Sequence, residues 1–233
     1  MIKNIAKMDL LIALYMFCIA VSELMGAKTF PLLQFSWLKV NASVAIFTIP
    51  LVFTINDVIT EVYGRERTRS IIRSGLLVVA LIFLFSLLAT ALPPSARFAS
   101  SEAAYDAIFH FSARMSFASL LAFAVAEFTD LYVFVKIRQL MGARALWLRN
   151  NVSNFVSQFL DTVIFMFAAF YAFDKGISEN FTFIVGLMIP YWLLKCAMSL
   201  IETPFVYAGV RWLKQERTVS GRVHPAPAAI PSR

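Results

Sequence analysis

The stretch FTINDVITEVYGRERTR, residues 53–69, joins the end of an apolar run to a cluster of arginines. Asp57 and Glu61 lie one helical turn apart within it, and Arg65, Arg67 and Arg69 follow. Carboxylates inside an apolar helix are costly, and basic residues that follow such a helix are typical of a cytoplasmic loop. The stretch therefore predicts a membrane-spanning helix that ends in a charged loop.

The composition of the whole chain also indicates a membrane protein. Of its 233 residues, 60% are hydrophobic and only 15% are charged, and the mean hydropathy is +0.73. Soluble domains are about 45–50% apolar and about 25% charged. The net charge of +7 is better explained by basic cytoplasmic loops than by binding to nucleic acid.

Six apolar runs are long enough, or nearly so, to cross a bilayer, which needs about 20 residues. They cover roughly 8–27, 42–63, 71–92, 116–135, 154–173 and 181–210. Lys and Arg collect at the N-terminus and after the second, fourth and sixth runs, so we expect both termini in the cytoplasm. We predict an all-α membrane protein, a bundle of six transmembrane helices over residues 1–217.

Two segments fall outside these runs. Pro93 and Pro94 are expected to end the third helix, and the residues up to 115 to form a short interfacial helix outside the membrane. Residues 218–233, TVSGRVHPAPAAIPSR, are rich in Pro, Ala and Ser, and we expect a disordered cytoplasmic tail.

Apart from Asp9, at the very start of the first run, seven of the 14 acidic residues fall inside the predicted spans. These are Glu23, Asp57, Glu61, Glu127, Asp130, Asp161 and Glu202, and Lys195 lies in a span as well. A charge at the centre of a bilayer costs about 2.5–3.5 kcal/mol on insertion scales. Such residues usually face the protein interior, where they pair with each other or with a substrate.

The depth of these residues distinguishes them. Asp161 and Lys195 fall near the middle of the fifth and sixth runs, where they are candidates for an ion pair, and Gln158 shares a helical face with Asp161. These polar stripes predict an internal cavity. Glu23, in the outer half of the first helix, is a candidate for an outer vestibule.

Three motifs resemble those of the queuosine precursor transporter family, once labelled vitamin uptake transporters. The first is INDVITEVYG at 55–64, the second AEFTDLYVFVKIR at 126–138 and the third LWLRNNVSNFVSQFLDTVIF at 146–165. They occur in the family order, and the hydropathy of the rest of the chain agrees.

The resemblance implies an inner-membrane importer of 7-cyano-7-deazaguanine or its aminomethyl relative, with six helices and a secondary-transport mechanism. The residues of this chain that correspond by position to the family's motif residues are Asn56, Asp57, Glu61, Gly64, Glu127, Asp130, Arg149, Asn150, Ser157, Gln158 and Asp161. We expect no cofactor or metal. The expected partners are the deazaguanine, the bilayer and a second copy of the chain, and we expect no nucleic acid.

We assign the candidate residues to two places. The cavity set is Asn56, Asp57, Glu61, Glu127, Asp130, Gln158, Asp161, Lys195 and Glu202. A carboxylate can accept both adjacent N–H donors of a guanine edge, and we expect Asp161 or Glu127 to do so. The gate set is Asp57, Glu61, Arg65 and Arg149, at the cytoplasmic mouth. Alternatively, Glu61 and its neighbours bridge to nearby arginines at the membrane surface.

Three other functions remain open. The chain is a substrate-binding subunit of an ATP-driven vitamin-type importer if the alanines of its first helix dock a partner. It is a membrane scaffold or sensor if the charges pair only structurally. An enzyme is disfavoured, because no G-x-S-x-G, H-E-x-x-H, P-loop or paired-histidine motif is present.

Overall fold

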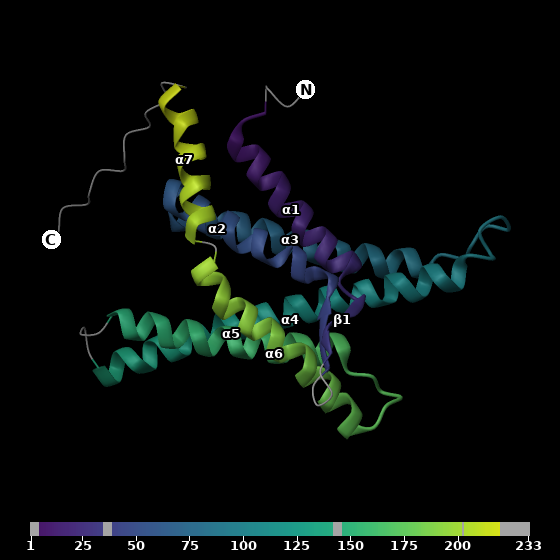
Figure 1. Cartoon of the computed structure of the whole chain (residues 1–233). Coiled ribbons are helices and arrows are strands. Elements are labelled where there is room, and N and C mark those ends of the chain that lie inside the picture. The colour runs from purple at the N-terminus through teal and green to yellow at the C-terminus, as the bar shows by residue number, and fades with distance from the viewer. Residues whose placement is uncertain (1–4, 35–38, 142–145, 202, 220–233) are drawn as a thin grey trace.

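The computed structural model describes residues 5–34, 39–141, 146–201 and 203–219. Helices dominate these ranges (Figure 1). The elements are α1 (Lys7–Met25), β1 (Thr29–Gln34), β2 (Lys39–Ser43), the 3-10 helix η2 (Val44–Phe47), α2 (Ile49–Tyr63), α3 (Arg65–Ala91), α4 (Glu102–Met141), α5 (Leu146–Phe170), α6 (Ile177–Ile201) and α7 (Thr203–Val219).

The described residues contain four helices that are long and apolar enough to cross a membrane. They are Lys7–Met25, Val44–Tyr63, Glu66–Ala91 and Glu102–Ala126, and Gln158–Phe170 is a shorter apolar helix. On α3, large apolar side chains such as Leu77, Leu81 and Leu88 are exposed, which suits a surface that contacts lipid. The expectation of a helical membrane protein is thereby confirmed.

Two predicted boundaries are wrong. Residues 102–115 form no separate interfacial helix, because α4 runs without a break from Glu102 to Met141. The run 181–210 is divided between α6, which ends at Ile201, and α7, which begins at Thr203. Pro204 lies in the first turn of α7, where a missing backbone N–H is tolerated, whereas inside a continuous helix it would break the hydrogen-bond ladder.

The helix α7 packs back on α2. Leu213 is fully buried against Val58 and Val62 of α2. At the other side of this contact, the Nζ of Lys7 donates a hydrogen bond to the backbone carbonyl of Trp212 and lies 4.9 Å from its ring. The start of α1 therefore lies beside α7. Of the expected tail, Thr218 and Val219 belong to α7, and 220–233 lie outside the described residues, so the rest of that expectation stays a prediction.

The helix α2 ends at Gly64, which has φ +84° and ψ 165°. Its N–H donates to the carbonyl of Thr60 at 2.9 Å, and α3 begins at the next residue. The hydroxyls of Thr60 and Thr68 lie 2.8 Å apart and join the two helices. This backbone region is essentially restricted to glycine, which explains why the motif on α2 closes on Gly64.

We expect Gly64→Ala to lower the free energy of unfolding by about 1–3 kcal/mol, because a Cβ strains this backbone conformation. The space around Gly64 is open, so any loss comes from the backbone and not from a clash. Gly176→Ala is the matched control, since that glycine also has open space but lies outside the left-handed region. Equal melting midpoints for the two purified variants in detergent would contradict this account.

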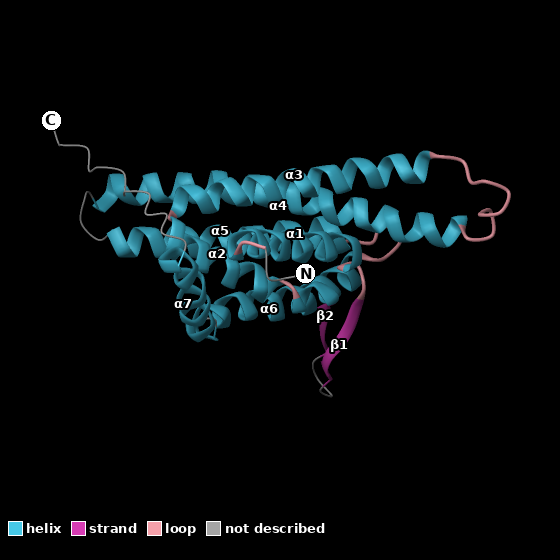
Figure 2. Ribbon diagram, turned by 90° about the horizontal axis from the view of Figure 1, so that it is seen from above, coloured by secondary structure: helices cyan, strands magenta, loops and turns pink. Residues whose placement is uncertain are grey.

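A two-stranded antiparallel hairpin, absent from the sequence prediction, follows α1. It pairs Thr29 with Ser43 and Phe30 with Ala42, and it projects from one side of the helices (Figure 2). Ser43 anchors its base: the side-chain hydroxyl donates to the carbonyl of Gly26 at 2.5 Å, and its own carbonyl accepts from Tyr191 at 3.2 Å. The hairpin therefore connects the end of α1 to the middle of α6.

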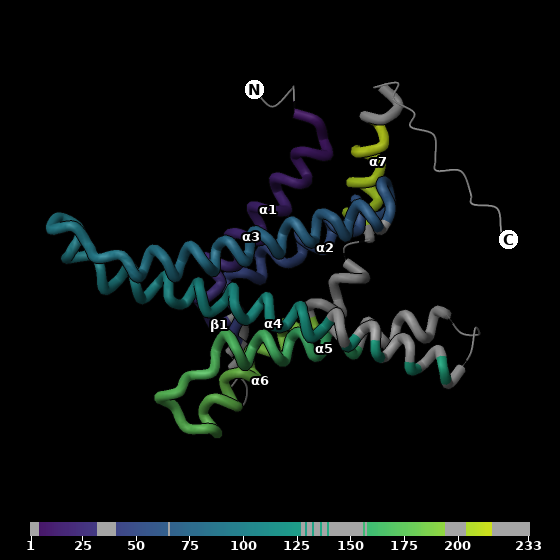
Figure 3. The backbone as a smooth tube through the Cα atoms, turned by 180° about the vertical axis from the view of Figure 1, so that it is seen from behind, coloured from purple at the N-terminus to yellow at the C-terminus, as the bar shows by residue number. Residues whose placement is uncertain are grey.

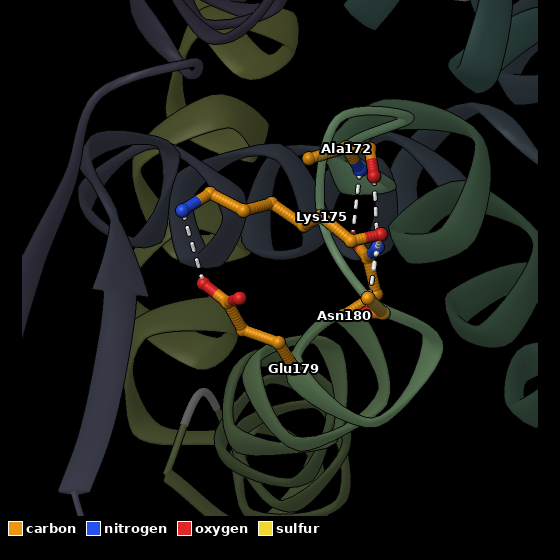
Figure 4. Close-up of polar contacts among 5 residues, drawn as sticks. Ala172, Lys175, Glu179 and Asn180 are labelled. Atoms are coloured by element: carbon orange, nitrogen blue, oxygen red, sulfur yellow. Dashed lines mark hydrogen bonds and ion pairs between the residues drawn. The ribbon is translucent and has the colours of Figure 1, made fainter.

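The connection between α5 and α6 is organised by one buried side chain, Asn180 (Figure 4). Its Oδ1 accepts from the N–H of Ala172 at 2.7 Å, and its Nδ2 donates to the carbonyl of Ala172 at 2.8 Å. Further bonds reach the carbonyls of Lys175 and Gly176. Lys175 and Glu179 form an exposed ion pair at 3.2 Å. These bonds hold the start of α6 against the end of α5.

The helices α2, α3, α4 and α5 run in roughly one direction, whereas α1, α6 and α7 cross this direction at an angle (Figure 1). The helices α3 and α4 run side by side (Figure 3). The end of α2, the end of α4 and the start of α5 lie on the same side of the structure, which we call the Gly64 end (Figure 1). The ends of α1 and α5 point the other way, toward the base of the hairpin, which we call the hairpin end. The positions of the site residues are described below relative to these two ends.

Candidate functional site

A cavity of about 360 Å³ lies between the helices. Side chains from α1 to α6 and from the base of the hairpin line it, including Phe53 of α2, Phe123 of α4 and Phe165 of α5. Small-molecule sites occupy about 300–1,000 Å³ and are mostly apolar with few polar groups. The cavity has the size and the lining of such a site.

The polar groups on the cavity wall come from six different elements. They are Tyr15, Ser22 and Glu23 of α1, Ser43 of β2, Asn56 of α2, Ser119 of α4, Asp161 and Thr162 of α5, and Tyr191 of α6. Several hold one another in place: the hydroxyls of Ser22 and Thr48 lie 2.6 Å apart, and Thr162 donates to the carbonyl of Gln158 at 2.9 Å.

The two carboxylates of the cavity lie toward opposite ends of it. Glu23 is near the end of α1 and thus at the hairpin end, whereas Tyr15 lies about 12 Å earlier along α1, at about 1.5 Å per residue. Asp161 is likewise about 13 Å along α5 from Phe170, the last residue of that helix. Asn56 lies beside Tyr15, at the Gly64 end.

Two acceptor atoms on this wall are buried without a hydrogen-bond partner among the described residues. They are Oε2 of Glu23 and Oδ1 of Asn56. A buried acceptor that lacks a donor costs about 1–3 kcal/mol. A ligand that presents N–H groups would remove this cost, so the cavity suits a molecule rich in hydrogen-bond donors.

Of the nine cavity candidates, Asn56 and Asp161 line the cavity. They come from α2 and α5, far apart in the sequence, so the fold brings the first and third motifs together. Gln158 is half-buried one turn from Asp161 and is not part of the lining. Binding of a substrate by any of them stays a prediction.

Asp57 and Glu61 do not line the cavity. Both are exposed on α2, whereas Val58 and Ile59 of the same helix are buried. Adjacent helical residues differ by about 100° in direction, so Asn56 faces inward while Asp57 faces outward. Neither residue contributes to the lining of this cavity, and the roles proposed for both stay predictions.

The other candidates fall on parts that the structure does not describe. Glu202 lies outside the described residues, between α6 and α7. For Glu127, Asp130, Lys195, Arg65 and Arg149, the helix is described but the side chain is not. The expected ion pair of Asp161 with Lys195 therefore stays a prediction.

Seven of the nine polar residues on the cavity wall were not among the cavity candidates: Tyr15, Ser22, Glu23, Ser43, Ser119, Thr162 and Tyr191. Glu23 was expected in an outer vestibule, and the structure instead places it in the same cavity as Asp161. The signal that could have found it is its position as the only carboxylate in the later turns of an otherwise apolar first helix.

A second, more open groove adjoins the first. It lies at the hairpin end between the hairpin, the start of α6 and the α5–α6 connection, and Asn41, Lys175 and Glu179 are among its lining residues. Phe170 lines both the groove and the cavity. Phe170 therefore contributes to the walls of both spaces.

Comparison with known proteins gives consistent matches. A family model described as "Putative vitamin uptake transporter" matches residues 43–209. The "Probable queuosine precursor transporter" of Bacillus subtilis (strain 168) is 34% identical over 170 residues, which cover 72% of this chain and 72% of that protein. No solved structure matches.

Two further relatives match over a shorter length. The "Queuosine precursor transporter" of Escherichia coli (strain K12) is 28% identical over 128 residues, 54% of this chain and 53% of that protein. The "Probable queuosine precursor transporter" of Haemophilus influenzae (strain ATCC 51907 / DSM 11121 / KW20 / Rd) is 27% identical over 138 residues, 57% of this chain and 54% of that protein. The chain thus spans about half the length of these two.

The family model covers well over half of the chain and includes all three motifs. The resemblance seen in the sequence is thereby confirmed. Together with the long apolar helices, these matches identify a multi-pass membrane protein, and the chain belongs to the queuosine precursor transporter family.

Proposed function

We propose that this chain imports queuosine precursors, 7-cyano-7-deazaguanine and its aminomethyl relative, across the bacterial inner membrane by secondary transport. The names of the relatives support this substrate class. The observation that carries the proposal is the cavity, because it brings Asn56 and Asp161 of two family motifs into one mostly apolar pocket.

The chemistry of the ligand suits this cavity. A deazaguanine presents N1–H and the 2-amino group as adjacent donors, and a carboxylate accepts both at once through charge-assisted bonds. Asp161 lines the cavity, which supports this role. Asn56 adds an acceptor at the same end, and the phenyl rings of Phe53, Phe123 and Phe165 offer faces on which a flat base can stack.

We further propose six membrane spans with both termini in the cytoplasm. The basic residues Arg67, Arg69 and Lys136 follow α2 or lie late in α4, at the Gly64 end, and basic residues favour the cytoplasmic side. The contact of Lys7 with Trp212 supports both termini on one side, since it joins the start of α1 to α7. The hairpin end then faces outward.

For the gate, we expect Asp57→Asn combined with Glu61→Gln to slow uptake while leaving substrate binding unchanged. Both side chains are exposed and lie away from the cavity. Exposed ion pairs contribute about 0–1 kcal/mol each, so the rate should fall by roughly two- to tenfold. The measurement is initial uptake rate in cells beside Kd for the purified protein. Unchanged uptake at equal expression would contradict the gate role of Asp57 and Glu61.

The function itself is tested in a bacterium that can neither make the deazaguanine nor import it. Such cells express this chain, receive nanomolar 7-cyano-7-deazaguanine, and are assayed for queuosine in tRNA. Return of queuosine is the expected result. If queuosine does not return although the chain is expressed in the membrane, either the proposed substrate is wrong or the chain needs a partner for transport.

Purified protein in liposomes separates the remaining alternatives. Uptake of the deazaguanine by this chain alone excludes a subunit that needs an ATP-driven partner. Binding without uptake favours that subunit. Absence of both, with folded protein, favours a scaffold or sensor whose charges have only structural roles.

A further inference from the structure

The side chain of Glu23 is an unusual feature of the cavity wall. It is only 7% exposed, it lines the cavity, and its Oε2 has no hydrogen-bond partner among the described residues. Ser116 and Ser119 of α4 face this carboxylate, and apolar residues such as Met115 and Val79 surround it on the wall. The protein thus keeps a carboxylate oxygen unsatisfied beside an internal space.

No basic side chain compensates Glu23 within the part of the chain that the structure describes. The lining of the cavity includes no Lys or Arg there, and neither described ion pair involves Glu23. Arg114, on the same stretch of α4, donates instead to the carbonyls of Ala168 and Tyr171 at 2.8 and 2.5 Å. Lys28, just beyond α1, is exposed.

A buried carboxylate without a cation is unfavourable unless something supplies a charge or donors. The proposed substrates differ in this respect: the cyano group is neutral and only accepts hydrogen bonds, whereas an aminomethyl group carries an ammonium with three donors. Asp161, the other carboxylate of the cavity lining, is then assigned to the guanine edge that both substrates share.

We propose that Glu23 binds the substrate's side group at the hairpin end of the cavity and makes the site prefer a deazaguanine that carries a primary ammonium. The inference rests on the proposed function and adds the side group to it. The guanine edge lies toward Asp161 at the Gly64 end, and the ammonium lies against Glu23 and the two serines. The two carboxylates thereby set the orientation of the molecule along the bundle.

The test compares the Kd of 7-aminomethyl-7-deazaguanine with that of 7-cyano-7-deazaguanine for purified protein in detergent. Glu23→Gln should weaken binding of the aminomethyl compound by roughly 10- to 100-fold, the range for a hydrogen bond to a charged group. Binding of the cyano compound should change by less than about threefold. Glu23→Asp retains the charge and should retain the preference. Glu179→Gln, the same substitution at an exposed site, should alter neither Kd.

A second readout distinguishes binding from folding. Because Gln removes a buried charge, the ligand-free Glu23→Gln protein should melt at the same temperature as wild type or above it. Equal loss of affinity for both compounds, or no loss for either, overturns the role of Glu23. If wild-type protein binds neither compound, the proposed function fails instead, so the two failures are distinguishable.

Discussion

Asp161→Asn should reduce uptake of the deazaguanine by at least about 100-fold. The substitution removes a charge and replaces one acceptor oxygen with an N–H₂ group that faces the donors of the base. Two hydrogen bonds to a charged group account for about 3–6 kcal/mol, and an unmatched donor in a dry pocket adds to the loss. The effect should be among the largest of any single substitution in the cavity.

The measurement for Asp161 is the initial rate of uptake against substrate concentration, at equal amounts of protein in the membrane. Asp174→Asn is the control, because that aspartate is exposed in the α5–α6 connection and the chemical change is identical. The Kd of the purified variant should rise in parallel with the loss of uptake. A variant that binds normally but does not transport would instead assign Asp161 to coupling.

Ala122→Trp should lower uptake to the level of cells that lack the chain. Ala122 is 1% exposed, and it lines the cavity from α4. An indole at this position occupies the space that the substrate needs, and it meets the packed walls of neighbouring helices. Overpacking costs about 1–3 kcal/mol, which should leave a folded but blocked protein.

Leu121→Trp is the matched control for this substitution. Leu121 is the neighbouring residue on α4 and is 40% exposed, so its side chain faces away from the cavity. The Leu121→Trp protein should retain uptake. Ala122→Leu adds a smaller side chain to the cavity than Ala122→Trp, so it should cause an intermediate loss of uptake. Full uptake by a folded Ala122→Trp protein would show that the substrate does not pass through this cavity.

The helical membrane fold could be predicted because it depends on local properties of the chain. Hydrocarbon excludes unpaired backbone groups, so an apolar run of sufficient length must form a helix whatever its neighbours do. Gly64 and the three motifs can likewise be recognised from short stretches of the sequence. The hairpin at residues 29–43 was missed; its strands are close in the sequence, but its anchor at Tyr191 is 148 residues away from Ser43.

The candidate site could be predicted only in part. Because charged and polar side chains are costly in contact with lipid, we predicted that those in the apolar runs face the protein interior. Asp161 and Asn56 do line the cavity. Asp57 does not line it, and the rotation of α2 that turns Asn56 rather than Asp57 inward depends on packing such as that of Val58 against Leu213. Glu23 was assigned to a separate vestibule because the sequence does not reveal which helices it faces.

The sequence by itself determined that this protein is a helical membrane protein of a transporter family, since hydropathy, basic loops and motif order are readable along one chain. Only the tertiary structure decided which polar side chains share a space. That depends on how the helices rotate and pack against one another, and packing is a property of residues far apart in sequence. The meeting of Asn56, Asp161 and Glu23 in one cavity is the result.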